Sequence, residues 1–127
     1  MVVLKKLKIN IVCGILDIVA SFLYFFSLFL IGTFSGAIGA SDGTEVLSQV
    51  LLIFAILFIV LHFISFFQSK KVHIRLLGTI FGLVGHGIYL VSGAYLGWLA
   101  MIFTIVASVF LLRDNHYFVL DAVEVRK

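Results

Sequence analysis

Gln68-Ser69-Lys70-Lys71-Val72-His73-Ile74-Arg75 is a short basic stretch near the middle of a 127-residue chain. A long apolar region lies on each side of it, and one glycine-containing loop interrupts each region. The chain is 63% hydrophobic and 12% charged, whereas a soluble domain has about 25% charged residues. Because a small soluble domain buries only about 60–70% of its surface, we expect the excess apolar surface to face lipid.

This pattern predicts an all-α membrane protein with four transmembrane helices in an antiparallel bundle of two helical hairpins. A span needs about 20 apolar residues, and the expected helices cover residues 8–34, 45–68, 72–92 and 96–112. Residues 1–127 then form a single transmembrane domain. The short tail after the fourth helix is expected in the cytoplasm. There it lies on the membrane surface, contacts a partner or is solvated.

The basic residues predict the orientation of the spans. All nine lie at the N-terminus, in the central turn or after the fourth helix: Lys5, Lys6, Lys8, Lys70, Lys71, Arg75, Arg113, Arg126 and Lys127. The positive-inside rule therefore predicts a multi-pass protein of the plasma membrane with both termini cytoplasmic. The net charge of +3 follows from this topology and indicates no nucleic-acid partner.

Small and polar residues indicate which helix faces contact one another in a membrane. Asn10, Gly14, Asp17, Ser21 and Tyr24 alternate at spacings of four and three, which places them on one helical face. The residues expected to let helices pack closely are Gly14, Ser21, Gly78, Gly82, Gly85 and Gly97. Gly-x-x-x-Gly is common in apolar sequence, so packing within the chain is favoured over a dimer face.

Asp17 is the most informative residue, because placing a carboxylate inside a membrane costs about 2.5–3.5 kcal/mol even on the insertion scale, which gives the lowest values. It lies roughly 12 Å from the inner end of its helix, and His62 roughly 9 Å from the inner end of the second helix. With Arg75 and Thr79 near the start of the third helix, we expect an intramembrane polar cluster of Asp17, His62, Arg75 and Thr79. Two interpretations stay open, a clamp that fixes helix register and a proton- or ion-responsive site. The clamp is favoured because the spans contain a single acid.

His86 is expected toward the outer side of the third helix, about 10 Å or more from the depth of His62. That separation disfavours a haem held by both histidines. The sequence has no Cys/His cluster with metal-ligand spacing, no convincing Ser-His-Asp order and no phosphate-binding glycine loop. We therefore predict no enzyme activity, no metal and no cofactor.

Three functions remain as hypotheses. The first is a small accessory or interaction protein that binds a larger membrane protein, or protects the membrane against one as an immunity protein does. The alternative is a small oligomeric transporter or channel with Asp17 as its titrating group. A membrane enzyme or redox subunit that uses His62 or His86 is the weakest. The expected partners are the lipid bilayer and either a membrane protein or further copies of the chain.

Overall fold

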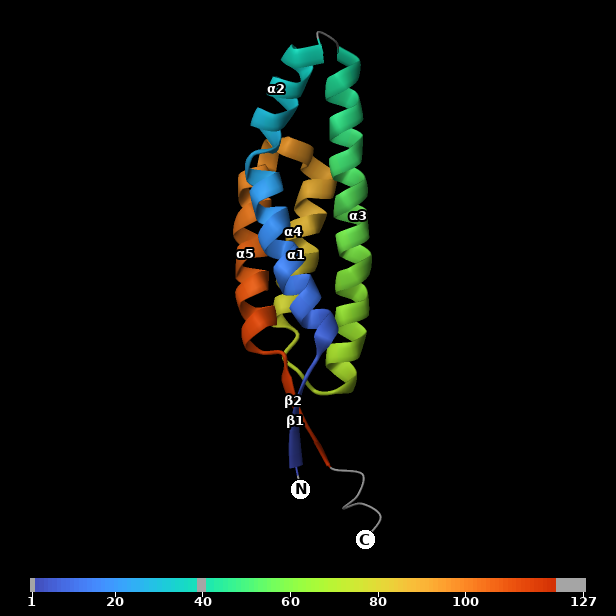
Figure 1. Ribbon diagram of the computed structural model, residues 1–127, viewed down its shortest axis with the longest axis vertical. Coiled ribbons are helices and arrows are strands. Elements are labelled where there is room, and N and C mark those ends of the chain that lie inside the picture. The colour runs from blue at the N-terminus through green and yellow to red at the C-terminus, as the bar shows by residue number, and fades with distance from the viewer. Residues whose placement is uncertain (1, 39–40, 121–127) are drawn as a thin grey trace.

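The computed structural model describes residues 2–38 and 41–120, and it confirms that the chain is nearly all helical (Figure 1). In chain order the elements are β1 (Val2–Lys6), α1 (Lys8–Phe25), α2 (Ser27–Ile38), α3 (Ser41–Lys71), α4 (Leu77–Ser92), the 3-10 turn η1 (Gly93–Leu96), α5 (Gly97–Arg113) and β2 (His116–Leu120). Three segments of the described chain are long and apolar enough to cross a membrane: Lys8–Phe25, Glu45–Lys71 and Leu77–Arg113.

The helices pack as a bundle whose two ends differ. α1 packs against α5 and α3, and α4 packs against α5 and α3. α2 packs mainly on α3, and this pair extends beyond the η1 turn at one end of the molecule (Figure 1). β1, β2 and the turn between α3 and α4 lie at the opposite end. The basic residues of the described chain lie at that same end, in β1, at the ends of α1, α3 and α5, and in the turn before α4.

The predicted helix over residues 8–34 is divided at Phe26, where the backbone leaves helical geometry. The Ser27 hydroxyl donates to the carbonyl oxygen of Tyr24 at 2.7 Å, and such a bond to the preceding turn bends a helix. Gly97 lies against that same carbonyl, and a side chain on Gly97 would collide with it. The kink is thus the place where the end of α1 meets the start of α5.

The turn between α3 and α4 is longer than the sequence indicates, because α4 begins at Leu77 and not near residue 72. His73 adopts a positive φ of 60°, which is uncommon for a residue other than glycine. The amide of Ile74 donates to the carbonyl of Ser69 at 2.9 Å, and the Ile74 side chain is buried. Together these contacts hold residues 72–76 in a tight turn that takes them out of the helix.

The tail after α5 contains a β-strand, which the sequence analysis did not predict. β2 pairs antiparallel with β1, and the register joins Lys6 to His116 and Val2 to Leu120. The amide of Leu7 also donates to the carbonyl of Asn115 at 2.8 Å. Both strands are rich in β-branched or aromatic residues, which suit strands better than helices. The pairing brings the N-terminal segment beside the segment that follows α5.

Candidate functional site

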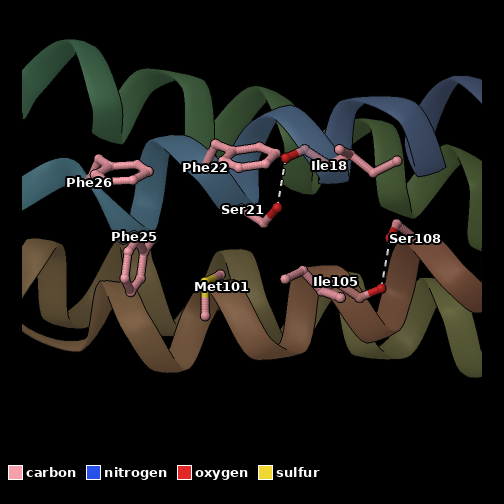
Figure 2. A pocket seen from close by; sticks show the side chains of 8 residues that line it. All are labelled: Ile18, Ser21, Phe22, Phe25, Phe26, Met101, Ile105 and Ser108. Carbon is pink, nitrogen blue, oxygen red and sulfur yellow. Dashed lines mark hydrogen bonds between the residues drawn. The ribbon is translucent and has the colours of Figure 1, made fainter.

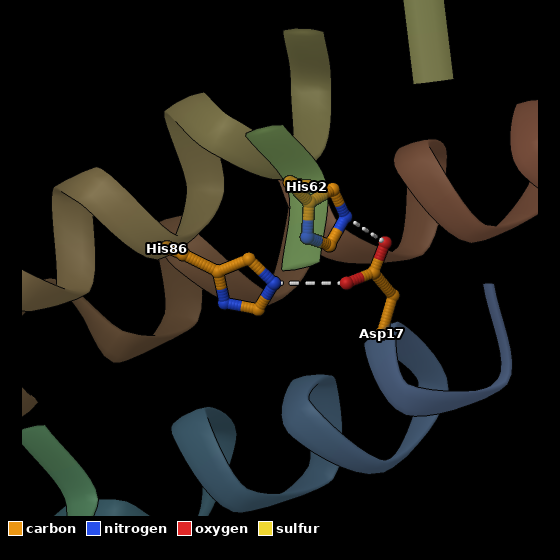
Figure 3. A group of neighbouring side chains, drawn as sticks. All are labelled: Asp17, His62 and His86. Carbon is orange, nitrogen blue, oxygen red and sulfur yellow. Dashed lines mark hydrogen bonds and ion pairs between the residues drawn. The ribbon is translucent and has the colours of Figure 1, made fainter. Parts of the chain in front are cut away.

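Asp17, His62 and His86 meet in the interior of the bundle, each from a different helix (Figure 3). Asp17 Oδ2 lies 3.0 Å from His62 Nε2, and Asp17 Oδ1 lies 2.8 Å from His86 Nε2. The exposed fractions of the three residues are 0%, 1% and 0%. One carboxylate thus bridges two imidazole rings whose centroids are 4.9 Å apart.

The three residues meet because they lie at the same depth. Asp17 is nine residues after Lys8, the start of α1, and His62 is nine residues before Lys71, the end of α3. His86 is nine residues after Leu77, the start of α4. At 1.5 Å per residue, each residue lies roughly 13 Å from the basic end of its own helix. Equal spacing from one end of the bundle therefore sets three side chains at one level.

The expectation that His62 and His86 lie at different depths is wrong. It rested on a third helix that begins near residue 72, and the later start of α4 moves His86 about 7 Å toward the depth of His62. His86 takes the place expected for Arg75 and Thr79 beside Asp17. Thr79 is buried, and its hydroxyl donates to the carbonyl of Leu76 at 2.8 Å. Arg75 is exposed in the turn before α4.

Each imidazole is also held at its other nitrogen. His62 Nδ1 lies 2.8 Å from the carbonyl oxygen of Phe58 in the preceding turn of α3. His86 Nδ1 lies 2.6 Å from the hydroxyl of Tyr24, whose ring stacks on Tyr89 at a centroid distance of 4.0 Å. Tyr24 is therefore part of the site. The sequence pattern placed it on the correct face of the helix, but the predicted polar cluster did not include it. Both rings are fixed in position and in rotation.

Gly82 provides the space for the His62 ring. A Cβ atom at Gly82 would collide with Cδ2 and Nε2 of that ring. The other expected packing glycines lie at helix contacts too: a Cβ would approach Leu112 Cγ to 2.8 Å from Gly14, the Leu111 amide to 2.9 Å from Gly78, and Thr104 Cγ2 to 2.9 Å from Gly85. The Ser21 hydroxyl donates to Ile18 within its own helix at 2.6 Å. Close helix contact and the geometry of the site thus depend on the same positions.

The hydrogen-bond partners of His62 and Asp17 determine how many protons these two residues hold between them when no metal ion is bound. A carbonyl oxygen only accepts, so His62 Nδ1 must carry a hydrogen toward Phe58. The contact between His62 Nε2 and Asp17 then needs one more proton, which sits on the imidazole or on the carboxyl group. The Asp17–His62 pair is neutral overall in either arrangement. Pairing of this kind lowers the cost of burying a carboxylate in an apolar interior.

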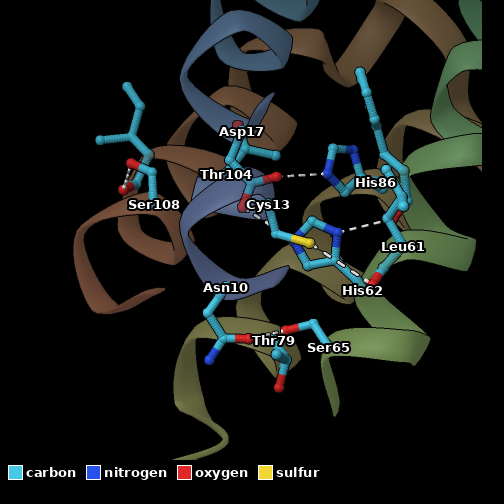
Figure 4. A network of polar contacts seen from close by, with 12 residues as sticks. Asn10, Cys13, Asp17, Leu61, His62, Ser65, Thr79, His86, Thr104 and Ser108 are labelled. Atoms are coloured by element: carbon cyan, nitrogen blue, oxygen red, sulfur yellow. Dashed lines mark hydrogen bonds and ion pairs between the residues drawn. The ribbon is translucent and has the colours of Figure 1, made fainter. Parts of the chain in front are cut away.

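A second polar group lies between this site and the basic end (Figure 4). The amide nitrogen of Asn10 donates to Ser69 Oγ at 2.9 Å, and Ser65 Oγ donates to the amide oxygen of Asn10. Between the two groups the thiol of Cys13 is buried and donates to the carbonyl of Leu61 at 3.6 Å. α1 therefore presents polar side chains along the bundle axis from Asn10 to Tyr24.

The arrangement at Asp17 offers electron-pair donors to a cation. Three potential ligand atoms, one from each of Asp17, His62 and His86, lie within 4.8 Å of one another. Imidazole nitrogen and carboxylate oxygen accept a proton or bind a metal ion. Comparison with protein-family models, curated proteins and solved structures gives no match to this chain.

Proposed function

We propose that this chain is a small four-span protein of the plasma membrane that acts as an accessory subunit by binding a transmembrane helix of a larger membrane protein. The four spans are α1 with α2, α3, α4 and α5. The apolar segment Leu77–Arg113 contains a glycine turn with φ of 62° at Gly93, and α4 packs against α5. Each of these two helices is about 24–26 Å long, close to the ~30 Å core of a bilayer.

The distribution of charge supports an orientation with the strands inside the cell. Lys5, Lys6, Lys8, Lys70, Lys71, Arg75 and Arg113 lie at the strand end of the described bundle. Basic residues concentrate on the cytoplasmic side of membrane proteins. Both strands and the turn between α3 and α4 are then cytoplasmic, and η1 faces the outer side with the exposed Tyr95 and Trp98. Tyrosine and tryptophan are enriched at such membrane interfaces.

The observation that carries the partner role is a phenylalanine ridge between two apolar grooves. Phe22, Phe26 and Phe29 are exposed and lie on α1, at the kink and on α2. On one side, a groove of about 430 Å³ lies between α1 and α5 (Figure 2). On the other side, a groove of about 390 Å³ lies along α1 and α2, lined by Val19, Phe22, Leu23, Phe26, Phe29 and Leu30.

The groove between α1 and α5 suits another helix better than disordered lipid. Ser21 and Ser108 border it, one on each helix, and both are nearly buried where α1 meets α5; small residues of this kind let helices approach closely in membranes. Each hydroxyl donates to its own helix, Ser21 to Ile18 and Ser108 to Ile105 at 2.7 Å, so neither needs a partner in the groove (Figure 2). A ridge beside a groove is the shape into which a second helix packs.

Photocrosslinking in the native membrane tests this proposal. A photoreactive phenylalanine analogue replaces Phe22 on the ridge or, as the matched control, Phe67 on α3. Their exposed fractions are 63% and 65%. We expect one discrete adduct with a larger membrane protein from position 22 and none from position 67, and Phe26→Ala should remove the adduct. Adducts with lipid alone, or only between two copies of this chain, would overturn the partner role.

A small oligomeric transporter or channel that carries a cation is the second candidate, and the buried Asp17 centre favours it. Asp17, His62 and His86 bring one carboxylate and two imidazoles together, and these groups can bind a proton or a cation. Cation flux into liposomes that contain the purified chain, lost on Asp17→Asn, would support transport. Equal flux from the Asp17→Asn protein would remove Asp17 from any such mechanism. Flux without any adduct from position 22 would favour transport over the accessory role.

A further inference from the structure

We infer that Asp17, His62 and His86 form a binding site for one divalent first-row transition-metal ion of the zinc class. The two imidazoles contribute Nε2, and Asp17 contributes its carboxylate (Figure 3). The inference goes beyond the accessory role and does not depend on it. It assigns a ligand to side chains that the partner surface does not use.

The distances between the donor atoms fit one small ion. A four-coordinate zinc ion with ligands at about 2.0–2.1 Å holds neighbouring donor atoms roughly 3.3 Å apart. The observed separations from the carboxylate are 3.0 Å to His62 and 2.8 Å to His86. All three donor atoms lie within 4.8 Å of one another. The two contacts with the carboxylate are already as short as in a zinc site, and the widest separation must shorten for all three atoms to bind one ion.

The contacts behind the ligands match those of a metal centre. A histidine that binds a metal through one nitrogen almost always donates its other N–H to a carbonyl, a carboxylate or water, which fixes the ring. His62 Nδ1 faces the carbonyl of Phe58 at 2.8 Å, and His86 Nδ1 faces the Tyr24 hydroxyl at 2.6 Å. These contacts leave both Nε2 atoms turned toward Asp17. In this arrangement the ion takes the place of the proton that Asp17 and His62 otherwise share, and that proton is released to solvent. The hydrogen between Asp17 and His86 Nε2 moves to His86 Nδ1, which then donates to the Tyr24 hydroxyl and leaves Nε2 free to bind the ion.

The donor set selects the class of ion. Two imidazoles and one carboxylate suit zinc, iron, cobalt or manganese, whereas magnesium and calcium prefer sites made of oxygen alone. A haem between the two histidines does not fit, because the carboxylate of Asp17 lies between them and bonds to both. With three protein ligands, a zinc ion retains an open position.

The first test uses Co²⁺ as a visible probe on the purified, metal-stripped full chain in detergent, followed by Zn²⁺ in competition. We expect one Co²⁺ per chain, with visible absorption that Zn²⁺ removes. His62→Gln and His86→Gln should each weaken Co²⁺ binding by about 100-fold or more, since even a group behind a ligand contributes about 10–100-fold. His116→Gln is the matched control, because His116 lies in β2 at the far end of the bundle, and it should bind as the parent does. Equal Co²⁺ affinity of the His62→Gln and parent proteins would overturn the proposal that His62 binds the ion.

A second measurement needs no variant and covers the case in which the histidine variants do not fold. X-ray absorption at the zinc edge of the loaded parent protein should show nitrogen and oxygen ligands near 2.0–2.1 Å with the outer scattering of two imidazoles. A sulfur ligand near 2.3 Å would place the ion at Cys13, the single cysteine of the chain, and overturn the assignment. A parent protein that binds neither ion at micromolar concentration would also refute it. None of these results would affect the crosslink from position 22, so the two proposals fail separately.

Discussion

The two faces of α1 differ in polarity and in exposure. The inner face has Asn10, Cys13, Gly14, Asp17, Ser21 and Tyr24, all buried, and its polar atoms bond to other helices or to its own backbone. The outer face has Val12, Ile15, Val19, Phe22 and Phe25, all exposed. This is the reverse of a soluble helix and is the pattern expected of a helix that faces lipid, where apolar side chains have no reason to turn inward. Packing and polar pairing on the inner face therefore set the stability, and size on the outer face matters little.

The largest effect should come from removing Asp17. Asp17→Ala leaves His62 and His86 without the carboxylate that both face, and breaking a buried pair in this way costs about 3–5 kcal/mol. The double variant Asp17→Ala with His62→Ala should lose less than the sum of the two single losses, because the residues are in contact. Chemical unfolding in detergent measures all three. Asp17→Ala combined with Arg75→Ala is the control and should be additive, since Arg75 is exposed near the basic end. Additive losses in both pairs would mean that Asp17 is not coupled to His62, and that polar pairing does not stabilise the inner face of α1.

A smaller but clear effect is expected from bulk on α4. Gly82→Leu places a side chain against the His62 ring and should cost about 1–3 kcal/mol, as overpacking does. Gly87→Leu is the matched control on the same helix, because a Cβ atom there meets nothing within 4 Å. The thermal midpoints of the two purified proteins give the answer. Equal midpoints would mean that the inner face of α4 is assigned incorrectly.

Tyr24→Phe sharpens the comparison within the inner face. It removes one hydroxyl from His86 and keeps the ring that stacks on Tyr89. A buried group left without its partner costs about 1–3 kcal/mol, so we expect a loss near the low end of that range. Co²⁺ affinity should fall by about 10-fold, because the hydroxyl orients a proposed ligand. A loss of stability with unchanged Co²⁺ affinity would mean that Tyr24 supports the fold and not the metal.

The smallest effect should come from the outer face. Phe29→Leu exchanges one lipid-compatible side chain for another on the exposed side of α2, and surface substitutions are usually within about 0.5 kcal/mol. Its thermal midpoint in detergent should match that of the parent. A loss as large as that of Gly82→Leu would mean that Phe29 is covered by another part of the molecule or by a second copy.

The sequence predicts the inner face of α1 well, because helical periodicity survives errors at the helix ends. The spacing of Asn10, Gly14, Asp17, Ser21 and Tyr24 places all five on one face, and all five are buried. It also pairs Asp17 with His62. The first inference uses only the spacing of residues within one helix. The second uses the depth of each residue, counted from a helix end that basic residues mark.

The full site escapes sequence analysis because it depends on one boundary. A start of α4 near residue 72 separates His86 from His62, whereas the start at Leu77 brings them together. The tight turn at His73 has no glycine or proline to mark it. The strands are missed because they are short. A five-residue segment such as His116–Leu120 does not show enough of an alternating pattern to distinguish a strand from a frayed helix end.

The pairing of β1 with β2 makes the number of membrane crossings matter to the fold. The register from Lys6–His116 to Val2–Leu120 requires both segments on the same side of any membrane. Only a chain that crosses an even number of times satisfies that condition. A chain that failed to insert one span would leave two short strands on opposite sides, each without its partner and marginal alone. In the proposed four-span arrangement, the β1–β2 strand pair can form only after α5 has returned the chain to the side on which it began.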